Sequence, residues 1–300
     1  MQKKIVHLDY DVLKYISTFV DHLNLWMICK FLSNGEVRKD IVYFFLRGPD
    51  ALRFYKEEDF RIYVYSRVRN PNKQISINLH GCDQVRDVSA LTNVHKLDLG
   101  KCHNIIDVSS LGNVHTLNLT WCWRITDVSA LGKVHRLDLS HCRNIIDVSA
   151  LGQVHDLNLR CCNITDVSAL GKVHILNLER CYNLTDVRAL GNVHTLILSY
   201  CFGIIDVSTL TNVHILNLRC CRNLTNVSAL GKVHTLNLSC CYNLIDVSAL
   251  GQVHDLNLYC CFGVTNVSTL GKVHRLNLSC CINITDVSGL DQVVELTLPR

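Results

Sequence analysis

The chain has 300 residues, of which 48% are hydrophobic, and a formal net charge of +4 that is spread along the sequence. A small and dispersed charge argues against a nucleic-acid-binding protein, which gathers Lys and Arg on one face. No segment reaches the roughly 20 apolar residues of a membrane-spanning helix and none near the start suits a secretion signal, so the 17 cysteines are expected to be reduced thiols of a cytoplasmic protein.

Residues 1–44 are expected to form a small helical domain. Apolar residues recur at helical spacing within residues 8–20 and 23–31, which predicts two or three short helices. The segment resembles an F-box, a helical module that binds a Skp-type adaptor in cullin ubiquitin ligases. The resemblance rests on the apolar residues of the first helix and on the Met-Ile-Cys-Lys run at residues 27–30. It implies that the adaptor is bound by Leu8, Leu13, Ile16, Phe19 and Ile28.

A plain cap on the repeats is the alternative interpretation of residues 1–44, because the open end of a stack of coils must be covered. The two interpretations are compatible. An F-box followed directly by near-identical repeats is also similar to proteins of large DNA viruses that infect amoebae. Residues 45–73, which contain Pro49, Pro71 and many aromatic and charged residues, are expected to connect this domain to the repeats and to pack on the first coil.

Residues 74–300 consist of near-identical units of about 20 residues. Ten units begin with a Val-His pair, from Val94 to Val273, and their spacing is 20 residues except for the 19-residue unit at Val154. Numbered from this Val, apolar residues occupy positions 1, 4, 6, 9, 12, 15 and 18. The two-residue step from 4 to 6 is typical of a strand, and the steps of three suit turns and short 3₁₀ segments better than an amphipathic α-helix.

One such coil cannot bury its own apolar side chains, whereas stacked coils bury those of their neighbours. The strands then form a parallel sheet with a rise of about 4.8 Å per coil. The pattern resembles leucine-rich repeats, both the short repeats of bacterial internalins and the cysteine-containing repeats of F-box proteins. We therefore predict an α/β solenoid, a right-handed leucine-rich-repeat coil with a parallel β-sheet on the concave face and short 3₁₀ turns on the convex face, preceded by the small α-helical domain.

Three other positions are interpreted as structural. Position 11 is often Asn or Gly, as at Asn104 and Gly203, and is predicted to have positive φ. Position 14 is Asp or Asn, such as Asp87, and is predicted to accept hydrogen bonds from the backbone of the following Ser and Ala. Position 19 is usually Gly and is predicted to lie in a turn.

Two residue types form ladders in the predicted stack. Position 2 is His from His95 to His274; a metal ion could bridge neighbours, but metal sites need a few converging ligands, so we interpret the row as a surface ladder copied with the repeat. Proton sharing along it would make it pH-sensitive. Position 9 is Cys from Cys82 to Cys281, expected to be buried packing where related repeats place Asn. A shorter column, Cys161 and four equivalents at position 8, is expected to be half-exposed and structural.

The partner-binding surface is predicted from the strand geometry. Positions 3, 5 and 7 are expected to face outward on the concave side, where variable side chains at positions 3 and 7 can encode recognition. Aromatic residues follow the strand, and those at position 10 either bind a partner or merely cover the bend. The mixed charges favour a protein ligand over a polyanion. The predicted partner-binding residues are Lys96, Trp121, Trp123, Arg136, Asp156, Arg160, Glu179, Tyr200, Arg219, Tyr259 and Arg275.

The repetition argues against an enzyme, because a catalytic site requires a unique arrangement of residues. No catalytic residue, metal, cofactor, nucleic acid or membrane partner is expected. We predict a protein-interaction protein of the cytoplasm (host cytoplasm if the chain is viral), acting as the substrate-recognition subunit of a Skp/cullin/F-box-type ubiquitin ligase whose repeats bind the substrate. The alternative is a non-ligase leucine-rich-repeat binding or structural module, viral or host-interacting, whose helical head only caps the solenoid.

Overall fold

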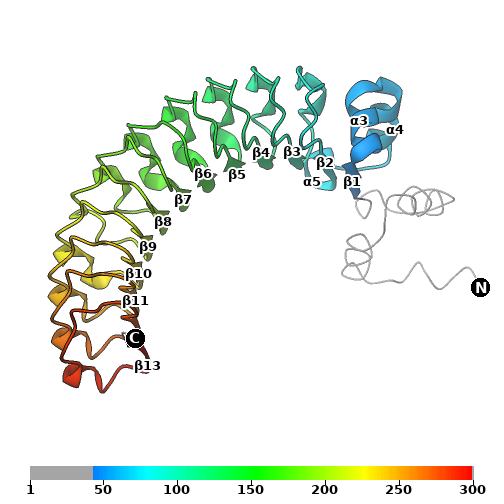
Figure 1. Ribbon diagram of the computed structural model, residues 1–300. Coiled ribbons are helices and arrows are strands. Elements are labelled where there is room, and N and C mark those ends of the chain that lie inside the picture. Colours follow the sequence, from blue (N-terminus) through cyan, green and yellow to red (C-terminus); the bar gives the residue numbers. More distant parts are fainter. Residues whose placement is uncertain (1–42, 299–300) are drawn as a thin grey trace, which may run out of the picture.

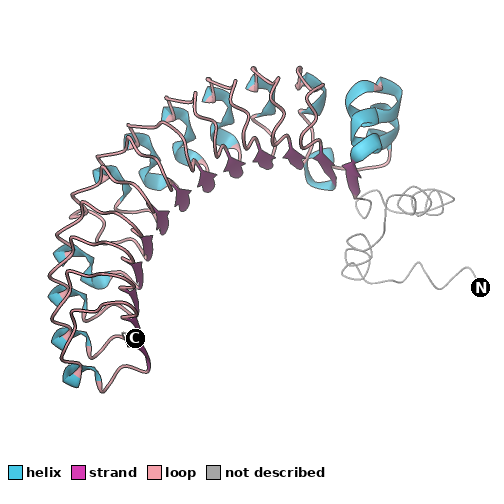
Figure 2. Cartoon of the chain, viewed as in Figure 1, coloured by secondary structure: helices cyan, strands magenta, loops and turns pink. Residues whose placement is uncertain are grey.

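The computed structural model describes residues 43–298 as a curved stack of coils (Figure 1). One sheet of 13 parallel strands follows the chain order from β1 to β13. The strands line the concave face and the 3₁₀ turns line the convex face (Figure 2), so the predicted solenoid is confirmed. The helices predicted from residues 1–42, with Leu8, Leu13, Ile16, Phe19 and Ile28, lie outside the described residues.

Each strand from β3 onward comprises positions 3 to 5 of the repeat. Equivalent residues pair across the sheet, as Leu97 does with Leu117, and the 19-residue unit keeps this register because Leu157 pairs with Leu176. The strands are β1 (Phe44–Arg47), β2 (Ile75–Asn78), β3 (Lys96–Asp98), β4 (Thr116–Asn118), β5 (Arg136–Asp138), β6 (Asp156–Asn158), β7 (Ile175–Asn177), β8 (Thr195–Ile197), β9 (Ile215–Asn217), β10 (Thr235–Asn237), β11 (Asp255–Asn257), β12 (Arg275–Asn277) and β13 (Glu295–Thr297).

A 3₁₀ turn follows position 15 in the coils, and between β2 and β13 only the coil from β8 to β9 lacks one. The turns are η1 (Ser89–Leu91), η2 (Ser109–Leu111), η3 (Ser129–Lys133), η4 (Ser149–Gln153), η5 (Ser168–Lys172), η6 (Arg188–Leu190), η7 (Ser228–Lys232), η8 (Ser248–Leu250), η9 (Ser268–Leu270) and η10 (Ser288–Leu290). The coil from β8 to β9 has Thr211 in place of the usual Gly at position 19, but Thr92 and Asp291 occupy the same position after η1 and η10, so a non-Gly residue there does not by itself remove the turn.

Glycine at position 19 lets neighbouring convex turns approach each other. A Cβ atom on Gly152 would lie 2.3 Å from the carbonyl oxygen of Ala169 in the next coil. The equivalent Gly112 has a φ of −60°, which any residue adopts. The requirement for Gly is therefore steric and comes from the neighbouring coil.

The seven apolar positions form one continuous core. In the unit that begins at Val233 and ends its 3₁₀ turn at Leu250, none of the seven side chains is more than 1% exposed. Full burial of an aliphatic side chain contributes roughly 1.5–3 kcal/mol to stability. In the inner coils these side chains are fully buried because a neighbouring coil covers each coil on both sides. In the last coil Ile284, Val287 and Leu296 are only partly buried.

The first end of the stack is covered by β1, α3 (Gly48–Lys56) and α4 (Glu58–Ser66), and α5 (Pro71–Gln74) leads into β2. Strand β1 pairs in parallel with β2, and Phe54 and Val64 are fully buried in the core that continues into the repeats. Pro49 lies in the first turn of α3, where its missing N–H costs nothing. Residues 44–74 thus close this end of the core.

A sharp turn follows each strand from β2 to β12, and its third residue has positive φ. In the coil of β3 the N–H of Cys102 donates to the carbonyl of Leu99, and Lys101 between them has a φ of 58°. Positive φ at this place is the type II pattern, which favours Gly, yet Gly81 is the only Gly there. The N–H of Lys101 donates to the carbonyl of Thr120 in the next coil, which extends the ladder past the strand.

The positive φ lies at position 8, so its prediction at position 11 was wrong. Among the described residues neither Gly203 nor any Asn at position 11 has positive φ. The Asn side chains act between coils instead: Nδ2 of Asn144 donates to the carbonyl of Trp123 at 2.7 Å. The side-chain amide thus provides a hydrogen-bond donor for a carbonyl in the bend of the preceding coil. The spacing of residues within one unit does not reveal this contact.

Position 14 orders the start of the 3₁₀ turn. Oδ1 of Asp147 accepts a hydrogen bond from the N–H of Ser149 at 2.8 Å, as predicted for the Ser. This backbone hydrogen bond lowers the pKa of Asp147, because it stabilises the carboxylate. Asn226 makes the same contact with Ser228, so the role of this position is local and structural.

Candidate protein-binding surface

The cysteine ladder at position 9 belongs to the core. Each thiol from Cys102 to Cys281 donates to the carbonyl of position 6 in the preceding coil at 3.0–3.3 Å. A thiol is a weak donor but a good small apolar residue. Burial raises the pKa of Cys122 to about 12. These cysteines are structural rather than reactive.

The shorter cysteine column at position 8 is more buried than expected. Cys161, Cys260 and Cys280 are partly exposed, whereas Cys220 and Cys240 are 5% and 8% exposed. Only three of the five thiols in this column are therefore partly open to solvent.

The histidines at position 2 form a continuous row at the entry to the strands. From His95 to His274, neighbouring ring centroids are 4.6–4.9 Å apart. Partial burial lowers the pKa of His115, and the neighbouring His95 and His135 lower it further. Burial also lowers the pKa of His95, His155 and His194, which disfavours their charged forms.

Charged residues predicted to bind a partner on the concave face contact one another. Arg136 and Asp156 form an ion pair at 2.8 Å, and Arg160 lies 3.5 Å from Glu179. Arg275 pairs with the carboxylate of Glu295 at 3.1 Å. Exposed ion pairs contribute about 0–1 kcal/mol to stability. Because these charged groups already have partners within the chain, they are less available to a ligand than the sequence alone indicated. Of the other predicted concave residues, Lys96 and Arg219 are exposed and Tyr259 is 39% exposed.

The two tryptophans lie on the edge that follows the strands and are 42% and 56% exposed. Trp121 stacks on His141 with centroids 4.0 Å apart and planes at 6°. Trp123 meets His103 edge to face at 5.5 Å. We call positions 8 and 10 of the coils the exit edge.

Farther along the exit edge, aromatic rings and a guanidinium form an unbroken stack, which we call the exit ladder. Tyr182 stacks on Phe202 at 5.6 Å and Tyr242 on Phe262 at 5.3 Å. The guanidinium of Arg222 lies between the two pairs, 5.5 Å from the Phe202 ring and 5.4 Å from the Tyr242 ring. Tyr182, Tyr242 and Phe262 are 55%, 38% and 40% exposed.

Tyr200 and Arg219, both predicted from the sequence, flank this ladder. The Tyr200 ring meets Phe202 edge to face at 6.4 Å, and the guanidinia of Arg180 and Arg219 lie 5.1 and 5.8 Å from it. Arg180 and Arg222 were missed. Arg222 occupies position 10 between two units with an aromatic residue there, which is the one sequence signal for its place in the stack.

No protein-family model matches the sequence, and no curated protein matches it. Among solved structures the chain is similar to an internalin (inlF) from Listeria monocytogenes, with a TM-score of 0.56 and 21% identity over 75% of this chain and 71% of that one. The chain has the leucine-rich-repeat fold.

Two further internalins of the same bacterium are similar to parts of this leucine-rich-repeat solenoid. The functional domain of InlJ, described as including a cysteine ladder, is 18% identical with a TM-score of 0.43, over 68% of this chain and 56% of that one. Internalin C2 (inlC2) is 20% identical with a TM-score of 0.33, over 76% of this chain and 82% of that one. In residues 43–298 no helix is long and apolar enough to cross a membrane.

Proposed function

We propose that this leucine-rich-repeat chain is a non-enzymatic protein-interaction protein whose exit edge binds a protein ligand. The exit ladder is the observation that supports this most directly. Exposed aromatic and Arg side chains are the residue types that dominate binding energy at protein interfaces. Here they are held in fixed positions by stacking, so little side-chain entropy remains to be lost on binding.

The spacing of the exit ladder favours a protein ligand over single-stranded nucleic acid. A base inserted between two rings needs about 7 Å, twice the roughly 3.4 Å stacking rise of bases, whereas neighbouring rings here lie 5.3–5.6 Å apart. The ring faces are occupied by each other and by Arg222. The exposed ring edges and Tyr hydroxyls instead suit a surface that packs across them.

The double variant Arg222→Ala/Tyr242→Ala should lose its ligand. Each anchor of this type contributes about 2 kcal/mol or more when truncated, so the affinity is expected to fall at least 30-fold. Proteins captured from a eukaryotic lysate by immobilised wild type and by the variant would be quantified by mass spectrometry.

The matched control is Ile205→Ala/Ile245→Ala, which truncates two residues that are 64% and 68% exposed on the same part of the stack but outside the ladder. We expect it to retain the captured proteins. Equal capture by the ladder variant and the control would contradict the proposed binding surface.

As the finer part of this proposal, residues 1–44 act as an F-box, and the chain is the substrate-recognition subunit of a cytoplasmic Skp/cullin/F-box-type ubiquitin ligase. The sequence resemblance at residues 8–19 and 27–30 supports it. A second support is that residues 44–74 already close the first end of the core, so the preceding residues are not needed as a cap. A non-ligase binding module, viral or host-interacting, is the alternative.

Binding to a Skp-type adaptor separates the two. Wild type is expected to retain a purified adaptor in a pull-down, and Leu13→Asp/Ile16→Asp to lose it, because charges replace apolar contact residues. Leu298→Asp, at the other end of the chain, serves as control. Absence of adaptor binding by wild type would remove the ligase role and leave the exit-edge proposal intact.

A further inference from the structure

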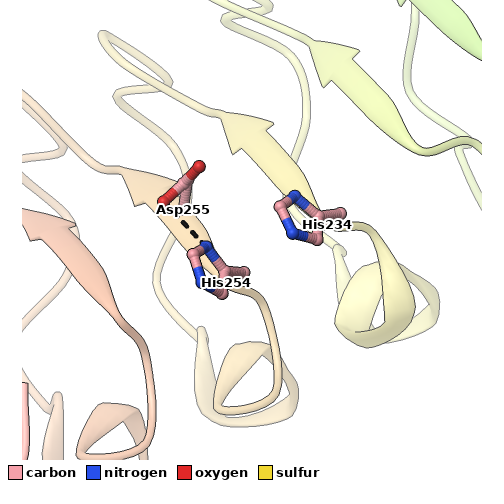
Figure 3. A group of neighbouring side chains, drawn as sticks. All are labelled: His234, His254 and Asp255. Atoms are coloured by element: carbon pink, nitrogen blue, oxygen red, sulfur yellow. Dashed lines mark hydrogen bonds and ion pairs between the residues drawn. The ribbon is translucent and has the colours of Figure 1, made fainter.

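The histidine row meets a carboxylate of its own repeat at two places, Asp156 and Asp255, which occupy position 3 directly after His155 and His254. The two places differ in what the carboxylate contacts. Oδ2 of Asp156 is paired with the guanidinium of Arg136 at 2.8 and 2.9 Å. Oδ1 of Asp255 instead lies 3.0 Å from Nδ1 of His254 (Figure 3).

The second place also includes the histidine of the preceding coil. The rings of His234 and His254 stack with centroids 4.6 Å apart and planes at 12°. The hydroxyl of Thr235 lies 3.2 Å from Nδ1 of His234 and 3.4 Å from Oδ2 of Asp255. One nitrogen of each imidazole and one carboxylate oxygen lie within 4.8 Å of one another, so three ligand atoms converge at one point of the row.

We propose that His234, His254 and Asp255 bind a divalent first-row transition-metal ion such as Zn²⁺. Imidazole and carboxylate are ligands that these ions accept together, and water would complete the coordination. Bonds of about 2.0–2.2 Å require ligand atoms roughly 3.4 Å apart in a tetrahedral site. The His254 and Asp255 side chains are 42% and 23% exposed, so they can rotate by the small amount needed while the sheet holds their backbones.

The neighbouring charges set how tightly the site binds. Nη1 of Arg275 lies 3.5 Å from Oδ1 of Asp255 and competes with the ion for the carboxylate. The Nε of Arg275 is also hydrogen-bonded to Glu295 at 3.1 Å. This second carboxylate weakens the competition of the guanidinium with the metal ion for Asp255. At His155 both Nε and Nη2 of Arg136 contact Oδ2 of Asp156, so a metal ion there would compete with a guanidinium that is doubly attached and closer than the one at Asp255.

Titration of the full-length chain with Zn²⁺ against a chelating dye, and with Co²⁺ followed by its absorption spectrum, tests the site. Wild type should bind one equivalent more tightly than the rest of the row, with a cobalt spectrum of nitrogen and oxygen ligands and no thiolate charge-transfer band. His254→Gln and Asp255→Asn should each weaken that equivalent by at least the roughly 10–100-fold that loss of a mere outer-shell partner costs, because each removes a direct ligand. Arg275→Gln should tighten it, because the competing cation is gone.

His155→Gln and Asp156→Asn are the matched controls and should leave the tight equivalent unchanged. Three results would overturn the proposal: no equivalent that binds more tightly than the remaining row, equal weakening by His155→Gln and His254→Gln, or a thiolate band that places the ion on cysteines. Circular dichroism of every variant shows whether the fold is kept. The titration needs no protein ligand, so its outcome is independent of the proposed exit-edge function.

Discussion

Deleting residues 213–232 is expected to leave a folded protein, whereas deleting residues 213–222 is expected to abolish cooperative folding. The longer deletion removes one complete coil, with β9 and η7. The β8 and β10 strands can then pair in the register that each now has with β9. Because stability in a solenoid is a sum over coils and their nearest-neighbour contacts, the loss should be a few kcal/mol at most.

The shorter deletion removes the strand but keeps the convex arc of the same coil. The remaining arc keeps β8 and β10 from pairing with each other. The core also loses the buried side chains of Leu216, Leu218 and Cys221, and nothing replaces them. Losses of about 2–5 kcal/mol per large buried side chain sum to roughly 6–15 kcal/mol for these three, which is comparable to the whole stability of a typical domain, about 5–15 kcal/mol. Urea unfolding followed by circular dichroism measures both. Similar instability of the two deletions would contradict the stacking account.

In the native chain, iodoacetamide at pH 8 is expected to modify Cys161, Cys260 and Cys280 while sparing Cys122. The thiolate is the reactive species, and a pKa of about 12 instead of the ordinary 9.0 for Cys122 lowers its thiolate fraction about a thousandfold. Its side chain is also fully buried. A time course of peptide mass spectrometry should show this contrast.

The same labelling in urea provides the control, because the raised pKa exists only in the folded state. There Cys122 should react as fast as Cys280. Because its raised pKa keeps the Cys122 thiol protonated in the folded chain, its labelling rate should increase only gradually as the pH rises from 8 toward 12. A sudden increase in labelling would indicate that the chain has unfolded. Rapid native labelling of Cys122 at pH 8 would show that the ladder is open to solvent.

The core and the sheet could be predicted because they depend on a pattern that each unit repeats. The seven apolar positions, a short strand around positions 4 to 6 and the turn after Asp at position 14 all follow from spacing within one coil; the structure places the strand at positions 3 to 5. The positive φ of Lys101 and the intercoil hydrogen bond of Asn144 could not, because they depend on atoms of the neighbouring coil. The steric need for Gly152 arises in the same way.

The binding surface was harder to predict for a related reason. The sequence indicates which side chains vary but not which of them satisfy each other across 20 residues, as Arg136 and Asp156 do. The exit ladder shows the opposite case, because Arg222 completes a stack although its type differs from the aromatic residues beside it. Contacts between equivalent positions of successive units decide both outcomes.

The turn at position 8 limits how the exit edge can change. Ten non-glycine residues there have φ between 57° and 65°, at a backbone cost on the order of 1 kcal/mol each. They include Lys, Trp, His, Cys, Arg and Tyr, but no β-branched residue, for which this conformation is least tolerable. Because unbranched side chains share nearly the same penalty, one can replace another without disturbing the coil. The solenoid can therefore acquire new specificities at this position while its folding stability stays constant, provided that Val, Ile and Thr are avoided.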